Sequence, residues 1–287
     1  MIARIVKIVS REYTLLMDNG ERHKAILMGK VRRQDAPATG DLVEAEFTDN
    51  RWVIQKILPR RNKLIRPYVA NVDQAIIVMS VVDPDFSPAL IDRLSILIEA
   101  AGITPLLAVT KCDLGIPEET EERIREYEKG PMQVIRTAKG SLDPSLASVL
   151  EGKISVLTGQ SGAGKSTLLN ELEPSFHLAT QEISKALGRG KHTTRHNELH
   201  PVAGGLVADT PGFSSLDFSH ITAQQLGQDV IDFEPYIGKC RFNDCVHQNE
   251  PGCAVKQAVE EGKIPLIRWQ NYLQVLEMIQ TRREKYV

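Results

Sequence analysis

The sequence is poor in aromatic residues and lacks a long hydrophobic run. Aromatic residues make up 5% of the 287 residues, so aliphatic side chains must fill most of any core. The longest apolar run lies around Ala75–Val82 and is far too short to span a bilayer. Residues 1–16 alternate apolar and charged side chains and lack the apolar segment of a secretory signal. We therefore expect a cytoplasmic protein with no membrane partner.

Cysteine is also scarce, and its distribution is uneven. Three of the four cysteines fall within fourteen residues, in the pattern Cys240-x₄-Cys245-x-His247-x₅-Cys253. Three thiolates and one imidazole suit tetrahedral Zn²⁺, and four protein ligands leave no open position for catalysis. A group of free thiols in a loop is the alternative. Because few apolar residues surround the cluster, a structural zinc ion is the interpretation we favour.

The small net charge of −2 hides an asymmetry along the chain. Residues 1–66 hold 14 Lys and Arg against 8 Asp and Glu, a net of +6, so the remainder carries −8. A basic first segment on an acidic whole suggests contact with a polyanion. A solvated face of a small domain is the alternative.

The first 58 residues have the pattern of a small all-β domain. Short apolar stretches, several of them alternating, are separated by turn signals such as Asp18-Asn19-Gly20. Five strands in about sixty residues predict an OB-type β-barrel, with an SH3-like barrel as the alternative. The expected strands are Ala3–Val9, Glu12–Met17, His23–Leu27, Asp41–Phe47 and Trp52–Ile57.

From Val72 onward the pattern changes to alternating strands and helices. Such alternation predicts an α/β domain with a mostly parallel sheet and helices on both faces. After Asp209 the regularity fades into a region with the cysteine cluster and a final helix near Leu266–Arg283. We expect this region to be a zinc-binding, mainly helical domain. We therefore expect three domains, at 1–66, 67–220 and 221–287. The expected strands and helices of the second are Gln74–Val82, Ser87–Ala101, Thr104–Val109, Glu118–Lys129, Pro131–Arg136, Lys153–Thr158, Ser166–Leu172 and Gly205–Ala208.

A phosphate-binding loop lies between an expected strand and an expected helix. The segment GQSGAGKS fits G-x-x-x-x-G-K-[ST] completely. Its backbone N–H groups suit the phosphates, Lys165 supplies a positive charge, and the Ser166 hydroxyl suits Mg²⁺. A glycine-rich turn without function is the alternative. The expected nucleotide contacts are Gly159, Gln160, Ser161, Gly162, Ala163, Gly164, Lys165, Ser166 and Thr167.

Two further motifs indicate guanine. Thr110-Lys111-Cys112-Asp113 resembles N-K-x-D, in which the aspartate accepts hydrogen bonds from guanine N1–H and its 2-amino group. Thr110 replaces the usual asparagine, and we expect it to lose the amide that bridges the base and the phosphate loop. Thr137-Ala138-Lys139 resembles [ST]-A-K, whose backbone N–H at Ala138 would meet guanine O6.

The switch motifs follow the phosphate loop. Asp209-Thr210-Pro211-Gly212 fits D-x-x-G, with Asp209 assigned to Mg²⁺ and Gly212 to the γ-phosphate. In the stretch GRGKHTTR at residues 188–195, a threonine can bind Mg²⁺, and we favour Thr194 as this ligand, with Thr193 as the alternative. Phe213 follows D-x-x-G and cannot orient water, so His192 is our candidate for the catalytic residue, with a solvent-exposed loop histidine as the alternative.

The order of these motifs is unusual, because the base motifs precede the phosphate loop. The cyclic order is that of an ordinary GTPase, so the sequence predicts a circular permutation. As a consequence, D-x-x-G leads straight into the C-terminal region, and movement of that switch could reorient this region.

Together, these features resemble the ribosome small subunit-dependent GTPase A family. The resemblance covers essentially the whole chain and rests on the motif order, on GQSGAGKST, GRGKHTTR and DTPGF, and on the cysteine spacing. It implies a GTPase that acts late in assembly of the small (30S) ribosomal subunit, with turnover stimulated by that subunit and an OB domain that binds its rRNA. It also supports His192 as the catalytic residue.

The barrel contains few aromatic residues, so shape and phosphate contacts with RNA are favoured over base stacking. Our RNA-contact candidates are Lys30, Arg32, Arg33, Arg60 and Arg61. We expect GTP and GDP as ligands, one structural zinc ion, Mg²⁺ with GTP, and a monomer. The alternatives are a P-loop ATPase or small-molecule kinase, against which Asp113 argues, and a nucleotide-dependent RNA-binding switch without significant turnover, which Phe213 leaves open.

Overall fold

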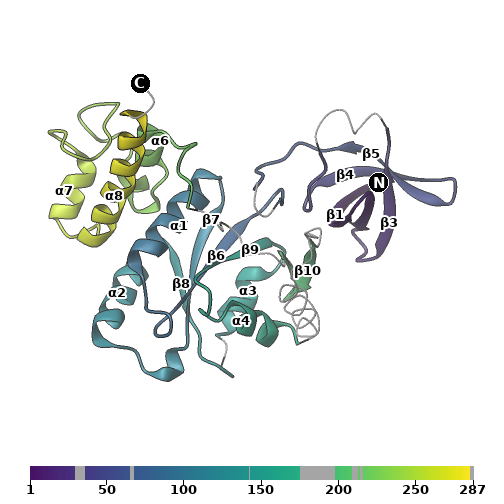
Figure 1. Cartoon of the computed structure of the whole chain (residues 1–287), viewed down its shortest axis with the longest axis horizontal. Coiled ribbons are helices and arrows are strands. Elements are labelled where there is room, and N and C mark those ends of the chain that lie inside the picture. Colours follow the sequence, from purple (N-terminus) through teal and green to yellow (C-terminus); the bar gives the residue numbers. More distant parts are fainter. Residues whose placement is uncertain are drawn as a thin grey trace. The chain divides into compact units, whose positions relative to one another are not determined.

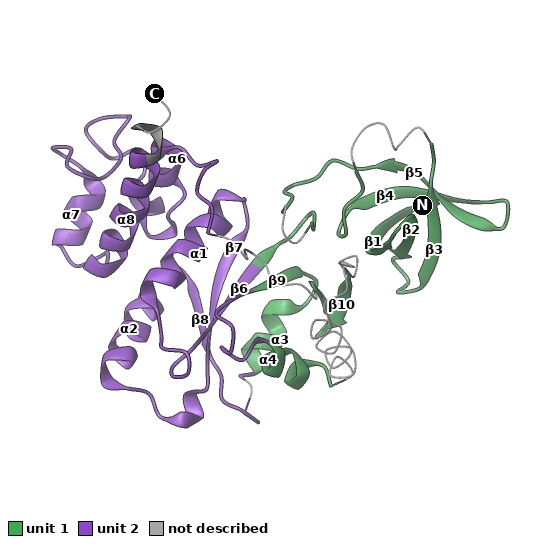
Figure 2. Cartoon of the chain, viewed as in Figure 1, with its two compact units in different colours: residues 1–74, 144–157, 166–212 green, residues 75–143, 158–165, 213–287 purple. Residues whose placement is uncertain are grey.

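The computed structural model describes residues 1–29, 36–64, 68–141, 143–174, 198–208, 213 and 216–284. The chain forms two compact units, each assembled from several stretches of sequence (Figure 2). The first unit contains residues 1–74, 144–157 and 166–212, and the second contains residues 75–143, 158–165 and 213–287. The base motifs and the first seven residues of the phosphate loop belong to the second unit, together with the cysteine cluster.

The N-terminal segment is a closed five-stranded barrel (Figure 1). Neighbouring strands follow the order β1-β2-β3-β5-β4, and β3 pairs with β5 in parallel. This Greek-key order is that of the OB fold and settles the choice against an SH3-like barrel. Alternate side chains, including Ile5, Leu15 and Ile54, fill the interior. The strands are β1 (Ile2–Val9), β2 (Glu12–Leu16), β3 (Arg22–Leu27), β4 (Leu42–Thr48) and β5 (Arg51–Ile57).

A tight hairpin joins β4 to β5. Its two loop residues, Asp49 and Asn50, have φ values of 48° and 58°. Positive φ at both central positions is the signature of a type I′ turn, whose twist matches that of the flanking strands. The turn fixes the register, in which Phe47 lies directly opposite Trp52.

Six strands form the second sheet, in the order β10-β11-β9-β6-β7-β8. The central strand β6 is buried along its whole length, as expected for a strand covered on both faces. The pairs β11–β9 and β7–β8 are parallel, whereas β10 runs antiparallel to β11. The strands are β6 (Gln74–Ser80), β7 (Thr104–Thr110), β8 (Gln133–Arg136), β9 (Ile154–Gly159), β10 (Leu199–Val202) and β11 (Gly205–Ala208).

The helices follow the expected alternation in the middle of the chain and dominate the C-terminal region. Helix α1 begins after Ser87, whose side chain caps the helix, and Pro88 occupies its first turn. Among the described residues, no helix is both long and apolar enough to cross a membrane. The helices are α1 (Pro88–Ala100), α2 (Glu118–Glu128), α3 (Pro144–Leu150), α4 (Lys165–Leu172), α6 (Ala223–Gln228), α7 (Ala254–Glu260) and α8 (Leu266–Glu284), with short 3₁₀ helices η2 (Cys112–Leu114) and η3 (Ile231–Tyr236).

The C-terminal helices share a hydrophobic core with α1. Ile96 and Leu97 of α1 pack in one cluster with Phe233 of η3 and with Tyr272 and Leu276 of α8. This shared core places α1 and the C-terminal helices in the same compact unit. The mainly helical C-terminal region agrees with the sequence prediction.

Candidate guanine-nucleotide and metal sites

The phosphate loop has the backbone that its sequence demands. Strand β9 ends at Gly159, and helix α4 begins at Lys165, so the loop occupies the turn between them. Gly159 has a φ of 122°, and a Cβ atom there would lie 2.1 Å from the carbonyl oxygen of Val78. Only glycine permits this close approach. Ser166 and Thr167 lie in the first turn of α4, where a helix N-terminus favours anions.

The Lys165 ammonium group folds back over this loop. Its Nζ donates to the carbonyl oxygen of Gly159 at 2.8 Å and to that of Gln160. Partial burial lowers the pKa of Lys165 from its usual value. A phosphate group at the loop would offset this desolvation by supplying an opposite charge.

A side-chain hydrogen bond joins the first base motif to the phosphate loop. Thr110 is buried, and its hydroxyl donates to the carbonyl oxygen of Ala163 at 2.6 Å. The Thr110 side chain also lies against Gly164, where an added Cβ would be 3.5 Å from Oγ1. The asparagine amide that would bridge the base and the loop is absent, as expected. The Thr110 hydroxyl instead joins the base motif itself to the phosphate loop.

The two base motifs lie side by side. The Asp113 carboxylate accepts from the backbone N–H of Lys139 at 3.1 Å, and the Cys112 N–H donates to the carbonyl oxygen of Thr137 at 3.1 Å. Lys111 has a φ of 61°, and its ammonium group donates to the carbonyl oxygens of Val82 and Asp83. A carboxylate has about four lone-pair sites, so Asp113 keeps acceptor capacity for a base.

Several predicted site residues lie outside the described residues. They are His192, Thr194, Asp209 and Gly212, together with Lys30, Arg32 and Arg33 of the barrel. Phe213 is described, and it packs against the hydrophobic core that α1 shares with the C-terminal helices. Its ring therefore has a packing role in the position where many GTPases have glutamine.

The two described arginines among the RNA-contact candidates form ion pairs. Arg60 is largely buried, and its guanidinium donates to both carboxylate oxygens of Asp41, at 2.6 and 2.8 Å. Arg61 pairs with Asp73 at 2.6 Å but keeps 64% of its side chain exposed. The bidentate pair gives Arg60 a structural role within the barrel unit. Contact of either residue with RNA stays a prediction.

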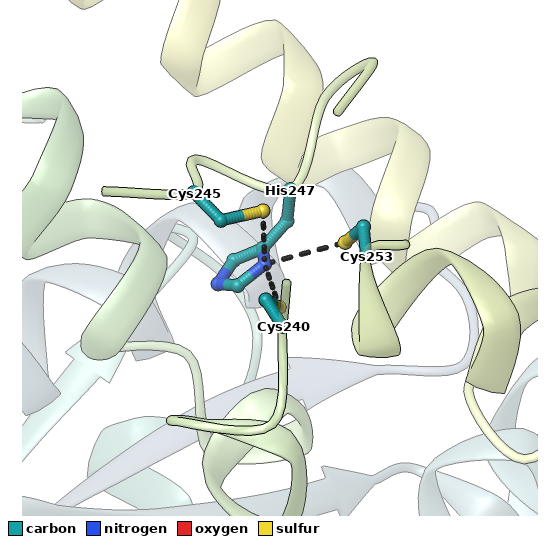
Figure 3. A group of neighbouring side chains, drawn as sticks. All are labelled: Cys240, Cys245, His247 and Cys253. Atoms are coloured by element: carbon teal, nitrogen blue, oxygen red, sulfur yellow. Dashed lines mark hydrogen bonds between the residues drawn. The ribbon is translucent and has the colours of Figure 1, made fainter. Parts of the chain in front are cut away.

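The cysteine cluster forms a compact set of ligand atoms (Figure 3). The Nδ1 atom of His247 lies 3.6 Å from Cys240 Sγ and 3.5 Å from both Cys245 Sγ and Cys253 Sγ. For a tetrahedral Zn²⁺ ion with ordinary bond lengths, the nitrogen-to-sulfur separation is about 3.6 Å. The four ligand atoms could therefore hold a metal ion at their centre.

Neighbouring groups orient these ligands. The backbone N–H groups of Ala254 and Lys256 donate to Cys240 Sγ and Cys253 Sγ, each at 3.4 Å. Burial lowers the pKa of His247, although Glu250 and the backbone carbonyl of Gly227 oppose the shift. The ring presents Nδ1 to the three thiols, so Nδ1 is the nitrogen that could bind a metal ion.

The sequence did not point to the residues that hold this loop in place. The Glu250 carboxylate accepts from the backbone N–H groups of Val246, Gln248 and Asn249 at 2.8 to 3.0 Å. Trp269 Nε1 donates to the carbonyl oxygen of His247 at 2.9 Å, which ties the loop to α8. A glutamate in a loop and a tryptophan in a helix carry no specific signal before the fold is known.

A buried ionic cluster that joins α8 to α1 and to η3 was also not evident from the sequence. Arg268 of α8 donates to Asp92 of α1 at 2.7 Å and to Asp232 of η3 at 2.6 Å. Asp92 also accepts from Tyr127 at 2.8 Å and from Asn271 at 2.6 Å. All three charged side chains are at most 5% exposed. We call these residues the Arg268 cluster.

Comparison with known proteins agrees with this architecture. A sequence profile described as RsgA GTPase matches residues 57–219. The small ribosomal subunit biogenesis GTPase RsgA 2 of Oceanobacillus iheyensis is 44% identical, and the small ribosomal subunit biogenesis GTPase RsgA of Bacillus subtilis is 41% identical. In both cases the alignment covers 99% of each chain.

Solved structures give the same result. The crystal structure of YloQ, a circularly permuted GTPase, superposes with a TM-score of 0.84 at 36% identity, covering 98% of this chain and 95% of that one. YjeQ from Thermotoga maritima superposes with a TM-score of 0.83 at 32% identity, covering 97% and 98%. The motif order, the barrel and the profile match thus agree, and the chain belongs to the RsgA GTPase family of circularly permuted GTPases.

Proposed function

We propose that this protein hydrolyses GTP, binds the small ribosomal subunit and assists its late maturation, with turnover that the subunit stimulates. The hydrogen bond from Thr110 to Ala163 is the observation that carries the guanine-nucleotide part of the proposal. It joins the loop that would select the base to the loop that would hold the phosphates, so that one ligand can engage both.

Within this proposal each described residue has a chemical task. Asp113 accepts hydrogen bonds from guanine N1–H and the 2-amino group, a donor pair that adenine lacks. Thr137 and Ala138 present backbone groups to the base, and Lys111 lies along its face. The loop from Gly159 to Thr167 wraps the phosphates, and Lys165 neutralises their charge.

Hydrolysis itself requires groups that lie outside the described residues. A bound Mg²⁺ would neutralise charge on the β- and γ-phosphates, with Ser166, Thr194 and Asp209 as its protein contacts. His192 would position the attacking water, because Phe213 packs in a hydrophobic core and has no hydrogen-bonding group. Gly212 would contact the γ-phosphate.

The ribosomal part of the proposal rests on relatives and on charge. The relatives of O. iheyensis and B. subtilis are named small ribosomal subunit biogenesis GTPases. Residues 1–66 carry a net charge of +6 and form an OB barrel, a fold that binds oligonucleotides. We propose that this barrel contacts rRNA of the 30S subunit, with Lys30, Arg32, Arg33, Arg60 and Arg61 as contact candidates.

We further propose one structural Zn²⁺ ion per chain, bound by Cys240, Cys245, His247 and Cys253. The nitrogen-to-sulfur separations of 3.5 to 3.6 Å fit its tetrahedral shell. Four protein ligands leave no site for substrate, so the ion would stabilise the fold. A cytoplasmic monomer with domains at 1–66, 67–220 and 221–287 completes the proposal.

The experiment measures GTP hydrolysis by the purified protein, alone and with small ribosomal subunits, with ATP as the nucleotide control. We expect slow GTP turnover alone, strong stimulation by subunits and no ATP turnover. His192→Ala should lower stimulated turnover while GTP binding persists. Stimulation of wild type and His192→Ala to the same rate would refute the role of His192.

Two other outcomes decide between functions. No stimulation by subunits would refute the ribosomal part and leave the guanine site intact. Tight GTP-dependent binding to subunits without hydrolysis would instead support a nucleotide-dependent RNA-binding switch, the alternative that Phe213 leaves open.

A further inference from the structure

Three rings gather at one end of the barrel. Phe47 of β4 lies 5.5 Å from Trp52 of β5, and His23 of β3 lies 5.6 Å from Trp52 on the other side, measured between ring centroids. The three residues line an open hollow of about 650 Å³ together with Glu21, Lys24, Asn50 and Arg51. We call this set of seven residues the ring hollow.

The strand pattern explains why these rings lie together. Val43 and Ala45 alternate inward along β4, and Phe47 continues the same alternation beyond the buried layer. Trp52 lies two residues before the buried Ile54 on β5 and so shares its side of the strand. The inner face of the barrel thus emerges at the barrel end as a set of aromatic surfaces.

Trp52 has a structural reason to be aromatic, because its ring covers the end of the barrel core. Phe47 has no such role. Trp52 is half-buried and packs against the barrel core, whereas Phe47 remains 55% exposed. An exposed aromatic ring held on rigid strands is a surface on which a planar ligand can stack. The type I′ turn at Asp49 and Asn50 fixes this ring before any ligand binds.

The charged groups of the ring hollow define the kind of ligand. Lys24 and Arg51 are exposed cations. Lys24 pairs with Glu12 at 3.2 Å on the barrel surface, whereas Arg51 has no ion-pair partner among the described residues. Glu21 lines the same hollow, and hydrogen bonds from Asn19 and His23 lower its pKa, which keeps it ionised. A carboxylate disfavours a bare phosphate or an acidic peptide. A nucleotide suits the mixture, because its base edge has N–H donors for Glu21 and its phosphates suit the cations.

We propose that the ring hollow binds an unpaired nucleobase of RNA, which stacks on Phe47 and meets Trp52 edge-on, because the two rings are inclined at 60° to each other. The adjoining phosphates would lie near Lys24 and Arg51. This proposal rests on the proposed ribosomal function and names a contact within it. It revises the expectation that the barrel meets RNA mainly through phosphate and shape, because two of the few barrel aromatics, together with His23, form one surface.

The first test measures binding of a fluorescently labelled hexaadenylate to the full-length protein at fixed low salt, by anisotropy. Loss of one stacked base predicts about 5- to 150-fold weaker binding for Phe47→Ala. Phe47→Leu keeps apolar area without an aromatic face and should also weaken binding. Phe242→Leu is the matched control, since Phe242 is an exposed phenylalanine, 41% accessible, with Arg241 over its ring.

Salt dependence provides an independent readout. Each phosphate contact on a single strand contributes about 0.7 to the slope of log affinity against log salt, so Arg51→Gln should reduce that slope by about 0.7. An RNA duplex should compete poorly with hexaadenylate. Equal competition by the duplex, or hexaadenylate binding by Phe47→Leu at the wild-type level, would overturn the proposal.

Parallel assays with small ribosomal subunits separate this proposal from the one on which it rests. If subunits stimulate wild-type GTPase while both Phe47 variants bind hexaadenylate normally, the ring hollow is refuted and the ribosomal function stands. If subunits fail to stimulate the wild-type GTPase but hexaadenylate binding still depends on Phe47, the ribosomal function is refuted and the ring hollow stands as an RNA-binding site. If Phe47→Ala weakens subunit binding but leaves hexaadenylate binding unchanged, the hollow contacts a ribosomal protein and our proposal fails.

Discussion

Thr110→Val tests whether the bridge between the base motif and the phosphate loop matters for guanine nucleotides. Valine has nearly the same shape but lacks the hydroxyl that donates to Ala163. Removing one partner of a buried hydrogen bond leaves the other unsatisfied, at a cost of about 1–3 kcal/mol. Because the bond exists without a ligand, that cost should appear as a lower free energy of unfolding.

The same loss should weaken nucleotide binding, because the two loops would no longer be held in register before the ligand arrives. We expect a rise in the Kd of GTP and GDP of up to about 150-fold, the equivalent of about 3 kcal/mol. Calorimetric titration would measure it, alongside urea unfolding. Thr110→Ser keeps the hydroxyl and should stay close to wild type in both assays.

A split result for Thr110→Val would refute this reasoning. If its stability falls but its affinity for GDP does not change, the bond is only part of the scaffold. If Thr110→Asn binds GDP as tightly as the wild-type protein, an amide can replace the hydroxyl as the bridging donor.

Three further predictions concern the C-terminal region and helix α1, which shares its hydrophobic core. Cys245→Ala should abolish bound zinc, as measured by elemental analysis, and lower the melting temperature; retention of one equivalent of zinc would contradict the four-ligand site. Burial raises the pKa of Glu99 from 4.5 to about 9, so the folded state holds a proton that the unfolded state loses, and stability should fall as pH rises between those values. Urea unfolding near pH 4.5 and near pH 9 measures this loss of stability, and Glu99→Gln should make it smaller. A loss as large as that of the wild-type protein would show that Glu99 is ionised when folded. Arg268→Met leaves two buried carboxylates unpaired and should destabilise the protein by about 3–5 kcal/mol in urea unfolding, whereas wild-type stability would show that the carboxylates become neutral at no cost.

Strong local patterns made most of the fold predictable from the sequence. The barrel strands alternate with period two, and helix α1 combines a Ser87 cap, Pro88 and apolar residues at helical spacing. The short edge strand β10 was missed because it has four residues, one of them Pro201, and pairs with only one neighbour among the described strands. Short helices such as α3 and α7, at seven residues each, have too few turns to show a period.

The candidate sites were predictable where chemistry is encoded by adjacent residues. The phosphate loop and the four candidate metal ligands belong to this class, since their spacing is local. The Arg268 cluster does not, because Asp92 and Arg268 are 176 positions apart and each resembles a surface charge in its own segment. The ring hollow is similar, since three rings from three strands meet only through the register of the barrel.

The packing of Phe213 shows how the circular permutation connects the D-x-x-G motif to the C-terminal region. D-x-x-G ends at Gly212, and the next residue packs in the core formed by α1 and the C-terminal helices. The Arg268 cluster fastens the same helices to α1, so they cannot shift freely as a separate body. If Gly212 contacts the γ-phosphate as proposed, a change there would act on the C-terminal region through Phe213, against a core that resists deformation. The C-terminal region should therefore respond by repacking side chains around Phe213, and not by reorienting freely as a whole.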